Sequence, residues 1–329
     1  MSRHSQSEVF TLLLALLLAL LSPAVHGAET WPRAVGTDFR AMVWNVSRES
    51  FYEHRRDYLT ALRAIDADLL IFDEMSGNRS ADDVTALLHE LDPAHPQAWQ
   101  VAYGSSGFNQ RVVFALRGPL ESLRQFDYLP YPPRLIARLR KVPTNPQQRQ
   151  WLEANLAAGI GAFAVEARLG GRRIIAVGVD LQCCGDTDGA WEEDRRHVEA
   201  RAIRTLLDRA WSARSPDAVI VAGDFNAVRG LRPVNLLQGK HQRSAQPLMI
   251  AEAKHANGID RWTWDGRGTP FPSRAIDFML HSRELSVRQA LVFDSETMNA
   301  AERERLNLPA DIFKPLSEHR PVVVDFAWR

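Results

Sequence analysis

The sequence feature that most constrains the fold is the segment Val219 to Asn226, which reads V-I-V-A-G-D-F-N. Four small or β-branched residues in a row predict a short strand that is covered on both faces, as central strands are. We expect Gly223 to break this strand and Asp224 and Asn226 to project from the turn beyond it. Because side chains alternate along an extended chain, both polar groups should lie on one side and the Phe225 ring on the other. Such a pair suits phosphate and metal chemistry, although a turn in which Asp and Asn bond to their own backbone explains the segment as well.

Four further motifs place polar residues at the expected ends of strands. They read M-V-W-N at Met42–Asn45, L-L-I-F-D-E-M at Leu69–Met75, R-A-I-D-F-M at Arg274–Met279 and S-E-H-R-P-V at Ser317–Val322. In this order, the five motifs resemble the endonuclease/exonuclease/phosphatase superfamily, which includes pancreatic-type DNases, abasic-site endonucleases, neutral sphingomyelinases and inositol-polyphosphate 5-phosphatases.

The resemblance runs from about Phe39 to Phe326 and implies an α/β fold. The expected architecture is a four-layered α/β sandwich, in which two mixed β-sheets pack face to face and the helices lie outside. The active site is expected where the strand ends converge. With no internal repeat or linker in the sequence, we expect residues 28–329 to form a single domain.

The N-terminus is predicted to lie outside this domain. Arg3 and His4 precede an apolar run from Phe10 to Leu21, and Val25-x-Gly27 offers small residues at a cleavage site. This pattern predicts a secretory signal peptide over residues 1–27, because the apolar run is shorter than the ~20 residues of a spanning helix. An uncleaved anchor is the alternative. The mature protein is expected to be secreted or periplasmic, monomeric and without stable membrane insertion.

Charge and cysteine content limit the binding partners and the disulfide bonds that this chain can have. Lys plus Arg and Asp plus Glu number 40 each, so there is no global positive field for nucleic acid, although a local patch can suffice. The two cysteines, Cys183 and Cys184, are neighbours in the chain. Neighbouring residues lie closer than ordinary disulfide partners, which leaves a strained vicinal disulfide or two thiols. A redox or metal role for them is a further alternative.

Periodicity and turn residues predict the remaining elements. The first helix is expected over Tyr52–Asp66, between strands at Arg40–Val46 and Asp68–Phe72, which gives a crossover unit. A hairpin turning at Gly170-Gly171 is also expected. The other expected elements are helices at Val84–Leu91 and Trp191–Trp211 and strands at Trp99–Gly104, Val112–Leu116, Ala162–Arg168, Arg172–Val179, Ile276–Leu280 and Val322–Phe326.

From Pro119 to Asn155 the sequence shows no clear helical or strand periodicity, and we expect a Pro-rich connection without regular structure. Its basic residues are either a solvated face or a loop that attracts a polyanion; they are Arg134, Arg138, Arg140, Lys141 and Arg149. Arg111 has two readings as well: a solvated loop residue, or a clamp that binds the substrate phosphate.

The resemblance assigns roles to individual residues. Glu74 matches the direct metal ligand, Asn45 lies beside it, and Glu318 stands near the metal where the family usually has Asp. Such oxygen ligands suit Mg²⁺ or Mn²⁺. His319 matches the catalytic histidine, and Asp277 matches the carboxylate that orients it.

Asp224 and Asn226 match the pair that orients the attacking water and contacts the phosphate. Either His319 or Asp224 could take the proton of that water. Ala275 separates Arg274 from Ile276, whereas many relatives place Arg directly before Ile-Asp. The largest departure is Asp180, which occupies a position where relatives have His or Tyr as a donor to the phosphate. An ionised Asp there can only accept and would repel the phosphate.

The implied function is a secreted, divalent-metal-dependent phosphohydrolase, most simply a phosphodiesterase of the nuclease or phospholipase C type. Its substrate would be a nucleic acid or a phospholipid headgroup. For a lipid, the candidate membrane-contacting residues are Trp262, Trp264 and Phe271. The alternative is a catalytically impaired relative that binds a phosphorylated ligand or a partner protein, which Asp180 and Glu318 favour.

Overall fold

The computed structural model describes residues 29–91, 95, 99–185, 187, 189–240 and 246–329. The predicted signal peptide lies outside these residues. The strands are β1 (Phe39–Asn45), β2 (Leu69–Met75), β3 (Gln100–Tyr103), β4 (Arg111–Leu116), β5 (Leu120–Ser122), β6 (Ala162–Leu169), β7 (Arg172–Asp180), β8 (Ala218–Asp224), β9 (Met249–Ile250), β10 (Lys254–His255), β11 (Asp277–His281), β12 (Leu285–Val292) and β13 (Val322–Trp328). The α-helices are α2 (Ser50–Glu53), α3 (Arg55–Ile65), α4 (Ala81–Leu91), α5 (Pro133–Leu139), α6 (Pro146–Ala158), α7 (Trp191–Arg214), α8 (Arg232–Gln238) and α9 (Ala300–Leu306).

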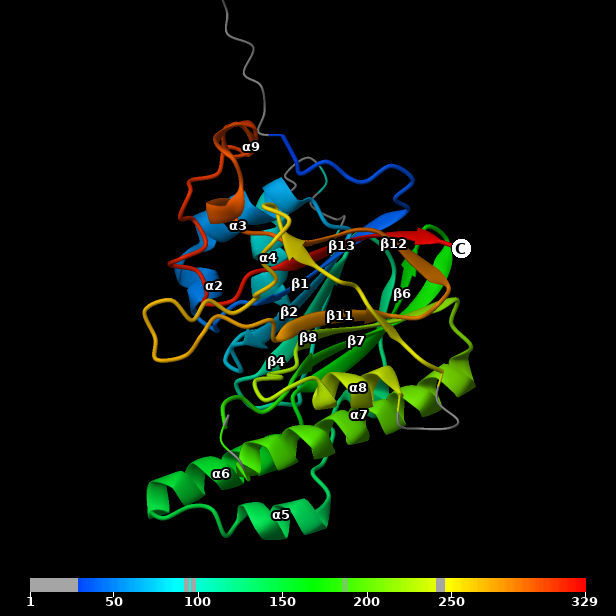
Figure 1. Cartoon of the computed structure of the whole chain (residues 1–329). Helices are drawn as coiled ribbons and strands as arrows, with labels where there is room; N and C mark the ends of the chain where they lie inside the picture. The colour runs from blue at the N-terminus through cyan, green and yellow to red at the C-terminus, as the bar shows by residue number, and fades with distance from the viewer. Residues whose placement is uncertain (1–28, 92–94, 96–98, 186, 188, 241–245) are drawn as a thin grey trace, which may run out of the picture.

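Two mixed sheets form the centre of the molecule, as predicted. One has seven strands in the order β10-β12-β13-β1-β2-β4-β3, and the other has six in the order β5-β6-β7-β8-β11-β9. The pairs β1–β2 and β7–β8 are parallel, whereas β1–β13 and β8–β11 are antiparallel. Helices α3 and α4 cover the outer side of the first sheet, and α7 and α8 cover that of the second (Figure 1). The four-layered α/β sandwich is therefore confirmed.

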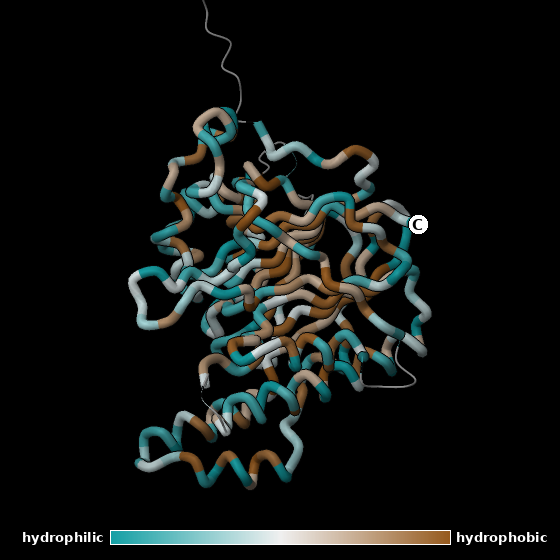
Figure 2. Tube along the Cα trace, in the orientation of Figure 1, coloured by the Kyte–Doolittle hydropathy of each residue, from teal (hydrophilic) through white to brown (hydrophobic). Residues whose placement is uncertain are grey.

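Alternation along the strands explains why the layers stack. In β1, Ala41 and Val43 belong to the large core that reaches the second sheet, whereas Met42 and Trp44 pack with the residues of α3 and α4. All four side chains are buried, as expected for a strand covered on both faces. The strands accordingly form the brown, hydrophobic centre of Figure 2, while the helices carry more teal residues.

Two expectations about local structure were wrong. The stretch from Pro119 to Asn155 is not an irregular connection but contains β5, α5 and α6. Its prolines start helices, because Pro133 and Pro146 occupy first-turn positions where no backbone N–H is needed. Asn145 caps α6 by accepting a hydrogen bond from the Gln148 backbone.

Gly223 does not break the central strand, since β8 continues through it to Asp224. A Cβ atom at Gly223 would lie 1.8 Å from the Val179 carbonyl oxygen, and its φ is +147°. Only glycine fits this close approach of β7 and β8. The glycine thus allows the ends of these two strands, and the carboxylates that they carry, to lie side by side.

Strand β12 was not predicted, because its burial does not alternate regularly and its register shifts between Val287 and Gln289.

Among the helices within the described residues, none is both long enough and apolar enough to cross a membrane.

Candidate active site

The predicted site residues converge at one end of the two sheets. Asn45 and Asp180 are the last residues of β1 and β7, and Glu74 lies near the end of β2. Asp224, the last residue of β8, pairs with Asp180 in the parallel neighbour and with Asp277 in the antiparallel one. Strand pairing alone therefore brings three carboxylates together.

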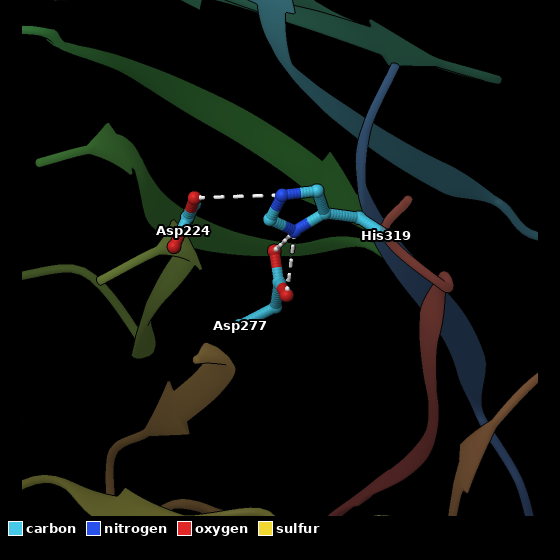
Figure 3. Close-up of side chains that lie close together, drawn as sticks. All are labelled: Asp224, Asp277 and His319. Carbon is cyan, nitrogen blue, oxygen red and sulfur yellow. Dashed lines mark hydrogen bonds and ion pairs between the residues drawn. The ribbon is translucent and has the colours of Figure 1, made fainter. Parts of the chain in front are cut away.

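His319 and Asp277 form the hydrogen-bonded pair that the resemblance implies (Figure 3). The Nδ1 atom of His319 lies 3.0 and 3.1 Å from the two carboxylate oxygens of Asp277. The Nε2 atom faces the Asp224 carboxylate at 3.9 Å. Burial by itself lowers the pKa of His319, but the negative charges of Asp277, Asp224 and Glu74 outweigh it and raise this pKa to about 10. The imidazole is therefore held in its charged form at neutral pH.

Neighbouring side chains that sequence reasoning missed hold this pair in place. Thr263 donates a 2.5 Å hydrogen bond to Asp277 and accepts from the Asp277 backbone. The Trp44 indole donates to the His319 carbonyl, and the Ser317 hydroxyl accepts from the His319 backbone N–H. Trp44 and Ser317 lie inside the predicted motifs, whereas Thr263 has no local sequence signal. Together they fix the backbone and the acid partner of the histidine.

Asp224 and Asn226 also meet as predicted. The Asn226 backbone N–H donates to Asp224 at 2.7 Å and its side-chain amide donates at 2.9 Å. Asp224 and Asn226 therefore form the hydrogen-bonded turn and also belong to the site. Burial is the main cause that raises the pKa of Asp224, followed by the charge of Asp277.

A β-bulge directs Glu74 into the site. The register between β2 and β4 shifts between Phe72 and Met75, and Glu74 has a φ of +53°. Among the described residues, none donates a hydrogen bond to its carboxylate, which lines a cavity. Burial raises the pKa of Glu74, although the charges of His319 and Arg48 oppose this. A carboxylate that faces a cavity without a protein donor fits a metal ligand.

Asp180 lies behind the cavity wall. It is 2% exposed, accepts a 3.1 Å hydrogen bond from the Gln110 amide on Oδ1, and is not among the residues that line the cavity. Its Oδ2 atom and Oδ1 of the equally buried Asp73 have no hydrogen-bond partner among the described residues. Burial and then the charge of Glu74 raise the pKa of Asp180 well above its ordinary value. This carboxyl therefore favours its neutral form, in which it repels a phosphate less than an ionised Asp would.

The cavity at the strand ends has a volume of about 670 Å³. Of the predicted site residues, it is lined by Glu74, Asp224, Asn226, Glu318 and His319. Asn45 and Asp277 lie buried behind these residues. Three cationic side chains and the two cysteines were not predicted there; they are Arg48, Arg274, Lys314, Cys183 and Cys184.

The other predicted basic groups do not line this cavity. Arg111 starts β4 and donates to the Phe108 carbonyl at 3.3 Å. Within the basic stretch, Arg138 pairs with Asp194, and Arg140 pairs with Glu153 at 2.7 Å. The charges of Arg138 and Arg140 are therefore at least partly neutralised by acidic residues of the protein itself.

The donors around the cavity fit a hard divalent cation. One ligand atom each from Asp224, Asp277 and His319 lies within 4.8 Å of the others, which is a possible metal group. Two of these residues already bond to each other, and Asp277 is further satisfied by Thr263. Glu74, without a donor, is the better anchor for Mg²⁺ or Mn²⁺, which take oxygen ligands and keep several waters.

Residues 42–297 match the model of the endonuclease/exonuclease/phosphatase family. The chain belongs to this family. The match spans four of the five motifs on which the resemblance was based. A search of curated proteins gave no match.

Solved structures of family members share the fold at low sequence identity. A family protein from Bacteroides vulgatus is 14% identical with a TM-score of 0.53, and the alignment covers 88% of this chain and 99% of that one. The human Nocturnin catalytic domain with bound sulfate is 17% identical (TM-score 0.51; coverage 88% and 94%). TDP2 from D. rerio, complexed with a single-strand DNA product, is 12% identical (TM-score 0.51; coverage 88% and 98%).

Proposed function

We propose that this protein is a divalent-metal-dependent phosphodiesterase. The observation that carries the proposal is the buried His319–Asp277 pair, whose free Nε2 atom faces Asp224 at the base of a cavity that Glu74 also lines. An acid-oriented histidine, a second carboxylate and a metal-binding carboxylate are the groups that phosphoester hydrolysis needs. Family membership supports the same class of reaction.

The charge state of the histidine suggests a division of roles. With its pKa raised to about 10, His319 at neutral pH can donate from Nε2 but cannot accept a proton there. It therefore suits stabilisation of a phosphate oxygen. Asp224, whose pKa is raised by burial, becomes the candidate base for the attacking water when a cation bound nearby favours its ionised form. Asp277 holds the imidazole charged, and Asn226 holds Asp224 in place. A divalent cation bound at Glu74, with Asn45 and Glu318 nearby, would supply neutralisation of the phosphate charge.

The substrate we favour is a phosphodiester of nucleic acid. The cavity wall carries Arg48, Arg274 and Lys314, which are cationic side chains of the kind that contact backbone phosphates. The D. rerio TDP2 structure with a DNA product supports this class. A phospholipid headgroup is the second candidate, because the Phe271 side chain is 51% exposed and lines the same cavity as Trp264. Trp262 instead packs on His255, with ring centroids 4.3 Å apart.

A substrate panel tests the proposal. Plasmid DNA, RNA, sphingomyelin, inositol phosphates and a generic bis-phosphodiester are incubated with the protein and Mg²⁺ or Mn²⁺. The wild type should hydrolyse at least one of these substrates. The His319→Ala variant should hydrolyse none of them, and the wild type should hydrolyse none in excess chelator. Hydrolysis that is unchanged in chelator would refute the metal requirement. No hydrolysis of any substrate by folded protein would favour the alternative, a catalytically impaired member that binds a phosphorylated ligand.

We also propose that the protein is exported, on the basis of the N-terminal apolar run between Phe10 and Leu21. Fractionation of the source cells and N-terminal sequencing test this. Export predicts a mature N-terminus near Ala28 in the periplasm or medium, whereas an intact Met1 in the cytoplasm would contradict it.

A further inference from the structure

Cys183 and Cys184 lie in the wall of the catalytic cavity, together with Glu74, Asn226 and His319. Both cysteines are exposed and free, and their Sγ atoms lie 2.7 Å apart. Cys184 adopts a left-handed backbone with a φ of +69°. The two neighbouring thiols thus lie side by side in the wall of the cavity in which the substrate is proposed to bind.

The backbone that carries these thiols is held firmly from behind. The buried guanidinium of Arg196 donates to the carbonyls of Gln182, Cys184 and Gly185, and it is paired with Glu193. The Gln182 backbone N–H donates to the buried Glu199 at 2.8 Å. Such support fixes the backbone that carries both thiols and lowers the entropic cost of binding a ligand between them.

The two thiols differ in acidity. The hydrogen bond with Cys183 lowers the pKa of Cys184 to about 7, against the opposing effect of burial, and Arg196 contributes in the same direction as the hydrogen bond. The pKa of Cys183 is raised, first because of its hydrogen bond with Cys184. A partly ionised thiol beside a neutral one is a reactive arrangement for electrophilic metal ions.

We propose that Cys183 and Cys184 form a two-sulfur binding site for a thiophilic d¹⁰ cation of the Zn²⁺ or Cd²⁺ class. Binding converts the two thiols and the cation into a dithiolate complex with release of two protons, and no atom changes its oxidation state. Thiolates select such soft ions, whereas the oxygen donors around Glu74 select Mg²⁺ or Mn²⁺. The cavity therefore contains two metal sites of opposite preference.

Geometry favours chelation over a disulfide between these cysteines. The Cα atoms of neighbouring residues across a trans peptide are about 3.8 Å apart, below the usual range of about 4.4–6.8 Å for disulfides. Zn–S bonds of about 2.3 Å at a tetrahedral angle need sulfurs about 3.8 Å apart. The Sγ atoms lie 2.7 Å apart in the metal-free protein, so chelation requires them to move apart by about 1 Å.

A cation held here would reduce the space that is open to a phosphodiester in the cavity. Because this consequence rests on the proposed function, the binding test is kept independent of catalysis. The protein is titrated with Cd²⁺ in chelator-free buffer, and the ultraviolet sulfur-to-cadmium charge-transfer band is recorded. The chain has only two cysteines, so Cys183→Ser with Cys184→Ser gives a thiol-free protein as a matched control.

The wild type should bind about one Cd²⁺ per chain with this band, and each single serine variant should bind at least tenfold more weakly. The double variant should show no band, and its thermal unfolding transition reports whether it remains folded. Absence of the band in reduced wild-type protein, or equal affinity in the single variants, would overturn the proposal. Oxidised wild-type protein that regains the band only after reduction would still support it.

The second arm measures turnover with Mg²⁺ in large excess and Zn²⁺ at the concentration that saturates the cysteines. Zn²⁺ should inhibit the wild type at least tenfold more strongly than the double serine variant, each relative to its own rate without Zn²⁺. Equal inhibition would show that Zn²⁺ acts at the oxygen ligands and would overturn the link to the cavity. A charge-transfer band without any turnover would leave the thiol site standing and refute the phosphodiesterase instead.

Discussion

Replacement of Asp277 by Asn should convert His319 from a group that is charged at neutral pH into one that titrates near neutrality. The Nδ1 atom and the carboxylate oxygens are 3.0 and 3.1 Å apart, which places the two charge centres about 4 Å apart. At an effective dielectric constant of about 20, two such charges interact by about 4 kcal/mol. Since about 1.36 kcal/mol corresponds to one pH unit, the pKa of His319 should fall from about 10 to about 7.

Nuclear magnetic resonance of ¹⁵N-labelled imidazoles measures this pKa in the presence of chelator, with His319→Ala identifying the signal among the ten histidines. The raised pKa also stabilises the fold: the contribution is complete below a pH of about 6.5 and disappears as the pH rises toward 10. Asp277→Asn should remove this slope. A wild-type His319 that titrates near 6.5, or an unchanged pKa in Asp277→Asn, would refute the charge argument.

Three further predictions concern single residues. Glu74→Gln should abolish Mg²⁺ binding by calorimetry and turnover while leaving the circular dichroism spectrum unchanged; retained binding would exclude Glu74 as the anchor. Asp325→Ala should lower the free energy of unfolding in urea by about 3–5 kcal/mol, because it leaves the buried Arg40, paired at 2.6 Å, without its partner; a loss below about 1 kcal/mol would contradict this. Asp180→Asn keeps the acceptor for Gln110 and removes an acid whose pKa is raised by burial. It should therefore raise the melting temperature in chelator more at pH 7 than at pH 4, and an equal gain at both would contradict a buried neutral acid.

The residues that sequence alone could place are those at the ends of predicted strands. Asn45, Glu74 and Asp224 follow apolar runs. Parallel pairing of β1 and β2 brings Asn45 and Glu74 to one edge of the first sheet, whereas Asp224 ends β8 of the second sheet, which packs against the first. His319 and Asp277 came from the family resemblance, and their distance of 3.0 Å confirms that they are neighbours. Their roles in catalysis stay predictions until the variants are measured.

The residues that sequence could not place depend on loops and on contacts between distant segments. Thr263 reaches Asp277 across 14 positions, and no local pattern marks that contact. Cys183 and Cys184 enter the cavity because Arg196, on a different element, holds their loop. Helix α6 is hidden in the sequence because a proline such as Pro146 is more often typical of irregular chain, whereas here it occupies the first turn of the helix.

The charge balance of the site is a physical reason to expect a metal. Five carboxyl groups that influence one another lie at the strand ends near His319; they are Asp73, Glu74, Asp180, Asp224 and Asp277. Burial is the first cause of the raised pKa values of Asp73, Asp180 and Asp224, and nearby carboxylates come next in each case. His319 supplies one positive charge, so the site cannot ionise fully from its own groups. A divalent cation at Glu74 would favour ionisation of the neighbouring carboxyls, Asp224 among them, and would thereby prepare the base that hydrolysis requires. The electrostatics of these residues therefore support the proposed dependence on a divalent metal.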